Sequence, residues 1–586
     1  MTTVVRRPCM LYYNLTPIPS SHLFHISLSL VAKDSNLLLT LPNWTSGSYL
    51  IRDYAGRLRN LHTSHGTLTQ LDKNHWAISN LVKGTTVTIT WNAFAYSTGI
   101  HDAWLDDGRG FINPSALFIA PDNCKQTAIH VEFNAPEYEI YTTLTSSTTH
   151  HFLAPNYASL LDAPFTLIKR GTPSALIELQ YQNIPHQIII SGQSVTLLDL
   201  GRIRNDFLAI ISTTINFWGQ VPFSRYLFHL HLGAHLYGGL EHDASCVLQY
   251  DAVSLPGLHE DTAPDAYPDF LTLVTHEYFH AWLVKFLRPQ AFLPYSLDRE
   301  SHTHDLWVFE GFTSYYENLI PYRAGTINQE KFLYLLSQRF NRVREREGFN
   351  HESLASASFN AWVHLYKQTD DSPYAQTSYY GKGAQLAFML DVALRHQSNN
   401  QQSLDTVLRN WFEEALTNHE HRGLADGTFL TKWITQPLVE RFISLTETTD
   451  SDLWYSTWTD TLAHLGFTEK APQNTPLCQS LLGLFVDTSR DFITVRYTHS
   501  EGAAFQAGLF AKDKLVAFNG YQIKVTDFDR LISQARGTIA EIHFFREQVL
   551  RAAKLAIPLK PKSGCGSLTV SEPTPLGLNW LRTANQ

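Results

Sequence analysis

The chain has 586 residues, of which 44% are hydrophobic, and its formal net charge is −9 at pH 7. This length and composition predict three or four domains with large buried cores. The mild negative charge and the lack of any Lys/Arg-rich run argue against a protein that binds nucleic acid or an anionic membrane surface.

Cysteines and the amino-terminal residues indicate the compartment. The five cysteines are scattered and show no C-x-x-C spacing, which argues against a disulfide framework and a thiolate metal site. The pair Arg6-Arg7 is similar to a twin-arginine export signal, but no apolar segment or small-residue cleavage site follows it. No window of about twenty uninterrupted apolar residues occurs in the chain. We therefore expect a soluble, cytoplasmic protein without a membrane partner.

Residues 1–165 are predicted to form an N-terminal β-sandwich domain. Apolar and polar residues alternate over 24–30, 87–91 and 129–133, and this period of two is typical of strands with one buried face. Between the first two of these strands, residues 41–53 contain Trp44. We interpret this segment as a turn with an aromatic anchor and no catalytic role.

Residues 166–468 change to a mixed α/β pattern that contains the first candidate site. The sequence Tyr237-Gly238-Gly239-Leu240-Glu241 is expected on the edge strand of a sheet that walls a cleft. Glycines at that place would let a substrate backbone approach closely. Two interpretations of Glu241 remain open: it binds the substrate, or it merely faces solvent.

The sequence His276-Glu277-Tyr278-Phe279-His280 lies in the apolar run 270–287, which predicts a buried helix that continues to residue 287. Residues four apart lie on one face of a helix, so His276 and His280 can both bind one metal ion, most often zinc. Glu277 is then placed beside the metal as a general base for water and not as a ligand. Buried His and Glu side chains need such a partner, because unpaired buried charge is costly.

A third protein ligand is expected downstream, and Glu310 within residues 306–316 is the best candidate. Two histidines and one glutamate leave a fourth coordination position open, which is the catalytic arrangement. We therefore expect one Zn²⁺ ion per chain, bound by His276, His280 and Glu310.

Beyond these ligands the pattern is mainly helical. Residues 328–346, 383–395 and 404–416 show the helical period of 3.6. Residues 469–478 contain two prolines and predict a linker. A further domain is expected over 479–560, and an irregular C-terminal tail over 561–586.

Several of these motifs resemble those of the gluzincin peptidases, in which two histidines of one helix and a glutamate of the next hold zinc. The sequence from His276 to Pro289 most resembles the glycyl aminopeptidase family, gluzincins with a C-terminal PDZ domain. Residues 41–53 are similar to the amino-terminal β-domain of that family. Residues 479–560 resemble a PDZ domain, with Gly483 in a loop similar to the G-L-G-F carboxylate-binding loop.

The resemblance implies a multidomain α+β fold. Its three parts would be an N-terminal β-sandwich over 1–165, a thermolysin-like zinc peptidase domain over 166–468, with a mixed sheet edge and a helical lobe, and a C-terminal PDZ domain over 479–560. A PDZ domain can add a peptide strand to its sheet and hold the peptide's C-terminus.

The resemblance also implies an activity and roles for the residues. It implies an aminopeptidase that hydrolyses the N-terminal peptide bond of peptides with a free N-terminus and prefers Gly or Ala there. Glu241 would hold the substrate ammonium group, and Gly238 and Gly239 would lie along the substrate. Tyr380 would donate to the oxyanion, although a register shift of one residue would give that role to Tyr379.

One departure from the wider gluzincins is visible, and two alternative functions remain. The aspartate that orients a zinc-bound histidine in those enzymes is Ser314 here, so the outer partner of His276 or His280 must come from elsewhere or be a weaker one. The first alternative is a zinc endopeptidase, in which Glu241 only lines the cleft. The second is a catalytically silent, peptide-binding PDZ scaffold.

Overall fold

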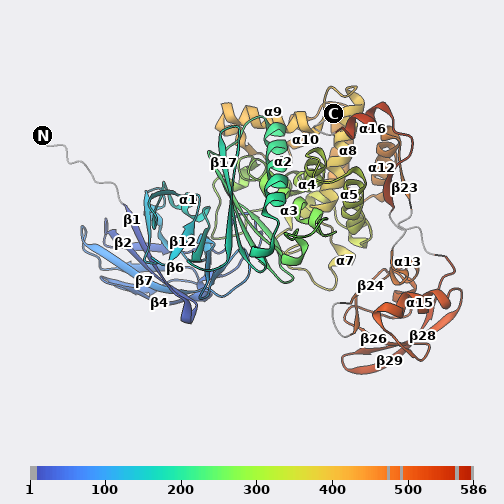
Figure 1. The fold of residues 1–586 in the computed structure, drawn as a ribbon, viewed down its shortest axis with the longest axis horizontal. Helices are drawn as coiled ribbons and strands as arrows, with labels where there is room; N and C mark the ends of the chain where they lie inside the picture. Colours follow the sequence, from blue (N-terminus) through green and yellow to red (C-terminus); the bar gives the residue numbers. More distant parts are fainter. Residues whose placement is uncertain (1–9, 471–474, 489–491, 561–565, 583–586) are drawn as a thin grey trace.

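The computed structural model of the chain describes residues 10–470, 475–488, 492–560 and 566–582. Its three largest hydrophobic clusters lie in an amino-terminal β region, in a central region and in a carboxy-terminal lobe. In Figure 1 the β region (blue) and the carboxy-terminal lobe (red) lie on opposite sides of the central region. The expected multidomain α+β fold with a β-rich amino-terminal region is confirmed.

The amino-terminal region consists of three sheets around one core. A seven-stranded sheet has the order β13-β14-β11-β1-β2-β7-β4, and two four-stranded sheets have the orders β10-β3-β6-β5 and β12-β15-β9-β8. The three alternating segments predicted as strands lie in β2, β7 and β11. The strand bounds are β1 Leu11–Ile18, β2 Leu23–Val31, β3 Leu37–Thr40, β4 Leu58–Thr63, β5 Thr67–Gln70, β6 His75–Ser79, β7 Thr86–Phe94, β8 Ala103–Leu105, β9 Arg109–Ile112, β10 Ala120–Pro121, β11 Ile129–Phe133, β12 Tyr138–Tyr141, β13 Thr145–Thr148, β14 His151–Ala154 and β15 Phe165–Lys169, with helix α1 at Tyr157–Leu161.

Two features connect this region to the next one. Strand β15 pairs with β9, so the amino-terminal β structure continues past residue 165 to Lys169. Trp44 and Tyr49 are buried in the core of the central region and not in that of the β region. The Trp44 indole donates to the carbonyl of Ser296, 2.9 Å away. The segment around Trp44 thus reaches out of the β region into its neighbour.

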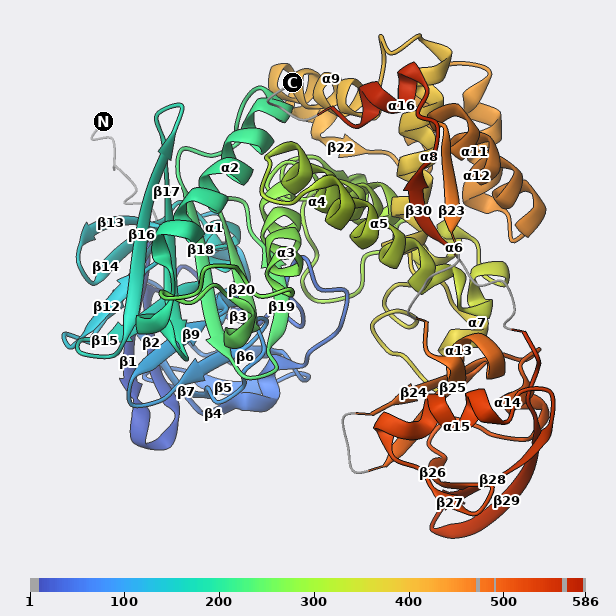
Figure 2. The ribbon, with the colours of Figure 1, turned by 45° about the vertical axis from the view of Figure 1, so that its right-hand side comes forward.

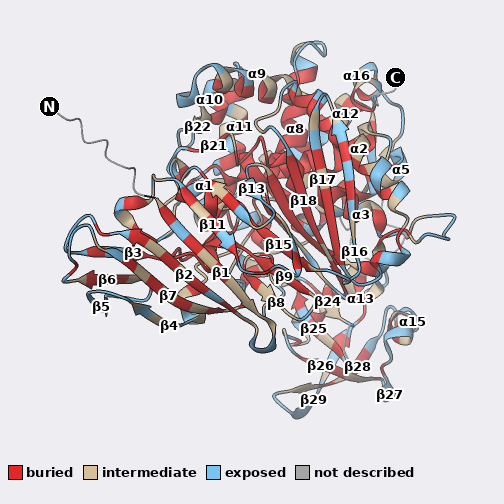
Figure 3. Cartoon of the chain, turned by 60° about the vertical axis from the view of Figure 1, so that its left-hand side comes forward, coloured by how far each residue is buried: buried red, intermediate tan, exposed pale blue. Residues whose placement is uncertain are grey.

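A five-stranded mixed sheet forms one side of the central region, in the order β16-β17-β18-β20-β19. Its middle strands are buried along most of their length (Figure 3). Strand β19 lies at the edge, antiparallel to β20, as predicted for the segment that contains Gly238 and Gly239. The bounds are β16 Ser174–Tyr181, β17 Ile184–Gly192, β18 Tyr226–Gly233, β19 Tyr237–Glu241 and β20 Ser245–Asp251, with helix α2 at Leu200–Trp218.

The helix with the two histidines is shorter than its apolar sequence predicts. Helix α3 spans Tyr267–Phe279, and His280 caps its carboxyl end. The expectation that it continues to residue 287 is wrong, because the chain turns back and Val284 adopts a positive φ of 96°. The Lys285 amide still donates to the His280 carbonyl at 3.0 Å, so the turn is fixed directly to the end of the helix.

Helices form most of the rest of the central region, and α4 packs against α3. The three predicted helices correspond to α5, α8 and α9. The bounds are α4 Phe312–Arg323, α5 Gln329–Arg344, α6 Leu354–Phe359, α7 Ser372–Ala375, α8 Gly381–Gln397, α9 Leu404–Thr417, α10 Phe429–Trp433, α11 Leu438–Glu447 and α12 Ser451–Leu465. Within the described ranges, no helix is both long enough and apolar enough to cross a membrane.

The carboxy-terminal lobe has its own core and its own sheet, with the order β24-β25-β26-β28-β29 and β27 paired to β26. Strand β24, directly after Gly483, is at the edge. The bounds are α13 Leu477–Leu482, β24 Leu484–Asp487, β25 Ile493–Thr498, α14 Ala503–Gln506, β26 Lys514–Phe518, β27 Tyr521–Gln522, α15 Phe528–Gln534, β28 Ile539–Arg546 and β29 Val549–Ala556.

The end of the chain returns to the central region, contrary to the prediction of an irregular tail. Strand β30 (Ser567–Val570) pairs with β23 (Phe467–Lys470), as Figure 2 shows, and helix α16 (Pro575–Trp580) follows. The Trp580 indole donates to the Tyr315 hydroxyl at 2.9 Å, deep in the central core. Burial of this large side chain explains why the segment is ordered despite its prolines and glycines.

The carboxy-terminal lobe is therefore inserted between two strands that pair with each other. Part of the predicted linker at 469–478 is β23 and part is α13, and its residues 471–474 lie outside the described residues. Residues 561–565, which precede β30, also lie outside the described residues.

Candidate active site

Three side chains bring their ligand atoms together beside the edge strand. His276 Nε2 lies 3.0 Å from His280 Nε2, and Glu310 Oε2 lies 3.7 Å from the first and 3.2 Å from the second. Ligands about 2.05 Å from a tetrahedral zinc ion would lie about 3.3 Å from one another. The three distances bracket this value, so the predicted triad fits an ion of that size.

The charges around the triad also favour a cation. Among the described residues, nothing donates a hydrogen bond to Glu310 Oε2 although that oxygen is buried. Burial alone would lower the pKa of His276, but the carboxylates of Glu310 and Glu317 raise it to about 10. The protonated form is thus stabilised because the site lacks positive charge, and a metal ion would supply that charge.

Partners on the far side of each imidazole fix how the two histidines point. His276 Nδ1 lies 2.6 Å from Glu317 Oε2, and His280 Nδ1 lies 2.9 Å from the Leu283 carbonyl. Both contacts place the proton on Nδ1, so the Nε2 lone pairs face each other and Glu310. Glu317 is itself paired with Arg339. The sequence missed Glu317, although its position seven residues after Glu310 puts both on one face of a helix.

Close packing of two helices sets the position of Glu310. The ligand lies in a π-helical turn, Trp307–Gly311, that continues directly into α4. A Cβ atom on Gly311 would lie 2.6 Å from the Cα atom of Gly383 in α8, so only glycine fits there. This contact draws the beginning of α8, and with it Tyr380, toward the triad.

Glu277 points into the cleft between the triad and the edge strand. Its Oε2 is buried and has no hydrogen-bond partner among the described residues. A Cβ atom on Gly239 would collide with the Glu277 carboxylate, so glycine at this place in β19 leaves room for that side chain in its present position. Burial raises the pKa of Glu277 to about 8; the two histidines oppose this shift and Glu241 adds to it. A bound divalent cation would act in the same direction as the histidines.

Glu241 closes the other end of the cleft, where the amino-terminal region meets it. The side chain is buried, with 4% of the residue exposed, and its Oε1 lacks a hydrogen-bond partner among the described residues. A Cβ atom on Gly47 would lie 2.5 Å from that oxygen. The interpretation in which Glu241 merely faces solvent is therefore wrong.

The segment around Trp44 also contacts the site, which the sequence did not predict. The Tyr49 hydroxyl donates to Glu310 Oε1 at 3.2 Å, and Gly47 faces Glu241. The expectation that residues 41–53 form only a turn with an aromatic anchor is wrong. No sequence signal could have paired Tyr49 with Glu310, because 261 positions separate them.

The two adjacent tyrosines have different surroundings. Tyr380 lines the cleft, its ring stacks on that of His276 with centroids 6.1 Å apart, and its hydroxyl lies 3.4 Å from that of Tyr366. Tyr379 is fully buried and does not line the cleft. Together with Gly238, Gly239 and the residues described above, Tyr380 encloses a cavity of about 260 Å³.

A buried ion pair supports the wall behind Glu241. Lys285 Nζ lies 2.6 Å from Asp162 Oδ1 and 3.0 Å from Ser46 Oγ, so the turn after α3 is tied to the amino-terminal region. His242 approaches the same carboxylate at 3.4 Å. Burial by itself would raise the pKa of Asp162, but Lys285 and His242 hold it well below its usual range.

Comparison with known sequence families agrees with this geometry. The model of the M61 glycyl aminopeptidase domain matches residues 269–386, and that of the peptidase M61 N-terminal domain matches residues 13–168. The first match contains the triad, Glu277, Glu317 and Tyr380. The chain thus contains the catalytic and the N-terminal domains of the M61 glycyl aminopeptidases. It is accordingly a metallopeptidase, a hydrolase of peptide bonds.

Solved structures include one that is similar over nearly the whole chain. An aminopeptidase N family protein from Idiomarina loihiensis has 28% identity and a TM-score of 0.89, and the match covers 98% of this chain and 100% of that one. An M1 zinc metallopeptidase from Deinococcus radiodurans has 12% identity, coverage of 76% and 95%, and a TM-score of 0.44. No curated protein matches the chain significantly.

This metallopeptidase should lose metal affinity when Glu317 is changed. Replacing it by alanine frees the His276 ring and should weaken zinc binding by roughly 10- to 100-fold. Titration of zinc against a competing chelator measures this. Glu330→Ala, an exposed glutamate on α5, is the control and should bind zinc like the wild type. Equal affinity in the Glu317 variant would mean that the contact does not orient the ligand.

Replacement of Lys285 by methionine should destabilise the fold by about 3–5 kcal/mol at pH 7, because Asp162 would remain buried without its cation. The pKa of Asp162 is lower in the folded than in the unfolded chain, so its stabilising effect is present above about pH 4 and is lost as the pH falls.

The difference between wild type and Lys285→Met should therefore persist from pH 7 to about pH 4 and shrink as the pH is lowered below about 4. Urea denaturation followed by circular dichroism gives both free energies of unfolding. A second change, Asp162→Asn, should restore part of the loss at pH 7. A difference that does not vary with pH would contradict the role of the ion pair.

Proposed function

We propose that this metallopeptidase is a zinc aminopeptidase that removes small residues, Gly or Ala, from the free amino terminus of peptides. The observation that carries the proposal is the buried Glu241 carboxylate, whose Oε1 faces the cavity beside Gly47 without a partner among the described residues. An ammonium group is the natural complement of a buried anionic oxygen. Gly47 of the amino-terminal region lies directly against this carboxylate, so that region closes this end of the cleft.

In the proposed reaction, each residue of the site has a separate role in binding the metal ion, binding the substrate or transferring a proton. His276, His280 and Glu310 would hold one zinc ion, which when bound supplies Lewis acidity and lowers the pKa of water. Glu241 binds the substrate's amino group, and the free edge of β19 at Gly238 and Gly239 lies along its backbone. Glu277 takes a proton from water and passes it to the leaving amine.

Tyr380 is the proposed oxyanion donor. It lines the cavity beside His276, whereas Tyr379 does not, and this supports Tyr380 in the choice that the sequence left open. A hydroxyl donor in a dry site contributes roughly 3 kcal/mol to the stability of the transition state.

The domain assignment is also part of the proposal. A mixed sheet with an antiparallel edge strand, a two-histidine helix and a helical lobe supports the thermolysin-like catalytic domain predicted over 166–468, apart from residues 166–169, which belong to β15. The carboxy-terminal lobe is proposed to be a PDZ domain over 479–560, because the edge strand β24 directly after Gly483 could pair with a peptide and hold its C-terminus. A cytoplasmic location stays a prediction.

The role of Glu241 in binding the amino group can be tested with a Gly-initiated peptide and its N-acetylated twin. The rate of cleavage of each is measured with and without a zinc chelator. We expect cleavage of the free amine alone, and none after chelation. Glu241→Gln keeps the shape but removes the charge, and should lower kcat/KM by at least tenfold. Cleavage of both peptides would favour an endopeptidase. A chain that retains no zinc and cuts neither would favour the silent PDZ scaffold.

The two tyrosines can be separated by removing one hydroxyl at a time. Tyr380→Phe should lower kcat about 10²-fold with little change in KM, because the hydroxyl acts on the transition state. Tyr379→Phe is the matched control and should keep nearly full kcat. Steady-state kinetics on the Gly-initiated peptide measures both, and the reverse pattern would give the role to Tyr379.

A further inference from the structure

A cationic cavity adjoins the cleft on the side of Tyr380. It measures about 250 Å³, and its wall includes Arg339, Arg342 and Arg346 together with Tyr380 and Ser378. Among the described residues that line it, none is acidic. Arg339 is paired with Glu317, whereas neither Arg342 nor Arg346 has an ion-pair partner within the described ranges.

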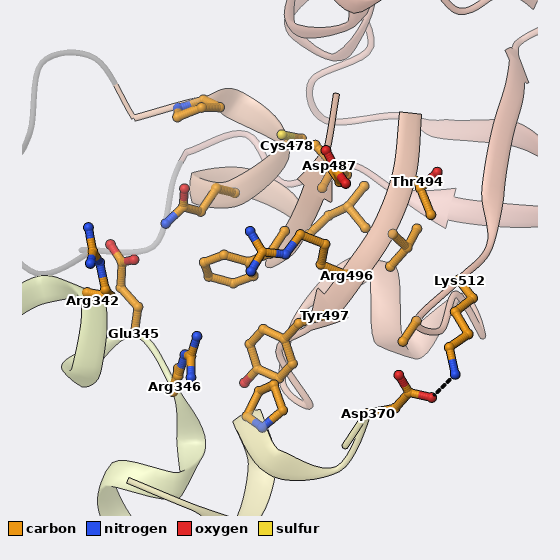
Figure 4. Close-up of a pocket in the computed structure, with 18 of the residues that line it drawn as sticks. Arg342, Glu345, Arg346, Asp370, Cys478, Asp487, Thr494, Arg496, Tyr497 and Lys512 are labelled. Atoms are coloured by element: carbon orange, nitrogen blue, oxygen red, sulfur yellow. Dashed lines mark hydrogen bonds and ion pairs between the residues drawn. The ribbon is translucent and has the colours of Figure 1, made fainter. Parts of the chain in front are cut away.

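The same arginines connect this cavity to a larger one. A cavity of about 900 Å³ separates α5 from the β24 and β25 strands of the carboxy-terminal lobe, and Arg342 and Arg346 line it too. Figure 4 shows both on the helical side, with Arg496 extending across from the lobe. The larger cavity also contains carboxylates: Asp370 pairs with Lys512, and Glu345 and Asp487 lie on the wall.

The guanidinium groups of Arg342, Arg346 and Arg496 line one cavity, where Glu345 is the acidic neighbour of Arg342. The pKa of Arg346 is lowered, first by burial and then by repulsion from Arg496 and Arg342. Like charges gathered at a cavity wall raise the local affinity for an anion, and arginine forks match the geometry of a carboxylate. The shape and charge of the smaller cavity therefore suit a single carboxylate group.

The direction of the cleft leads toward these arginines. If the amino group lies at Glu241, the substrate runs along β19 past Gly239 toward Tyr237, four residue steps or roughly 13 Å away. The surrounding chain raises the pKa of the Tyr237 hydroxyl and Glu317 adds to this shift, although 70% of the residue is exposed to solvent. Arg339 and Arg342 oppose that shift, which places both within electrostatic range of this end of the cleft.

We infer that Arg342 and Arg346 bind the α-carboxylate of the substrate, and that the enzyme acts on short peptides with both termini free. This inference rests on the proposed function, since it takes the amino group to lie at Glu241. Glu241 would recognise one end of the peptide and the arginines the other. The substrate class is then oligopeptides of a few residues, such as those left by endopeptidases that act earlier.

The test compares Gly-Ala-Ala, Gly-Ala-Ala-Ala and Gly-Ala-Ala-Ala-Ala, each as the free acid and as the C-terminal amide. Release of glycine gives kcat/KM for each. For at least one length, the wild-type enzyme should prefer the acid by about tenfold or more, because only the acid can form charge-assisted hydrogen bonds. Equal rates for acid and amide at every length would overturn the inference.

Arginine variants then test whether the preference for the acid over the amide depends on Arg342 and Arg346. In Arg342→Ala/Arg346→Ala the ratio of acid to amide should fall toward one, and in Arg342→Lys it should be intermediate, because lysine keeps the charge but not the fork. Arg204→Ala, an exposed arginine on α2, should keep the wild-type ratio. Since the readout is a ratio within one preparation, partial loss of folded protein does not affect it. A preference that persists in the double variant would place the carboxylate elsewhere and overturn the assignment.

Failure of the inference can be told from failure of the proposed function. Glycine p-nitroanilide has a free amino group but no carboxylate, so an aminopeptidase should cut it whether or not the arginines bind substrate. If it is cut while acids and amides react equally, the arginine site alone is wrong. If neither it nor any of the peptides is cut, the aminopeptidase proposal is wrong as well.

Discussion

Four buried glutamates around one small cavity set the main constraint on this fold. Glu310, Glu277, Glu241 and Glu317 each expose 4% of their surface or less. Carboxylates so close together cannot all stay ionised in a dry site unless positive charge lies among them. The protein supplies part of it, through Arg339 beside Glu317 and through the two histidines. A divalent ion at the histidines would supply the rest. The distances within the triad and its negative charge thus both favour a bound cation.

Close contacts at glycines in the neighbouring strands and helices hold these carboxylates in place. Gly239 leaves room for Glu277, Gly47 leaves room for Glu241, and the contact of Gly311 with Gly383 brings the helix of Glu310 against that of Tyr380. In each case a missing side chain lets a polar group or a second helix approach closely. The amino-terminal region takes part through Tyr49, so it is a wall of the cleft as well as a separate β structure.

The carboxy-terminal lobe has a different relation to the cleft. It is inserted between β23 and β30, and its β24–β25 face meets α5 and α7 across the larger cavity. The Tyr374 hydroxyl donates to the Thr498 carbonyl at 2.7 Å, and the Tyr497 hydroxyl donates to Glu347 at 3.0 Å, so the lobe is fixed to α7 and to the turn that follows α5. Its position thus affects the far side of the cleft from Glu241.

The sequence alone determined the features that depend on local spacing. The helical period placed His276 and His280 on one face of a helix, with Glu277 beside them. The strand period predicted β2, β7 and β11, and the glycine pair before Glu241 marked the edge strand. Tertiary structure decided what depends on contacts between distant positions. The end of α3 at Phe279 lets the Leu283 carbonyl meet His280, and Tyr49 reaches Glu310 from another region. Residues 567–580 of the predicted tail form a strand and a helix because the Trp580 side chain is buried in the central core. A sequence period records which face of an element is buried, but not which distant element covers it, because that depends on how the elements pack.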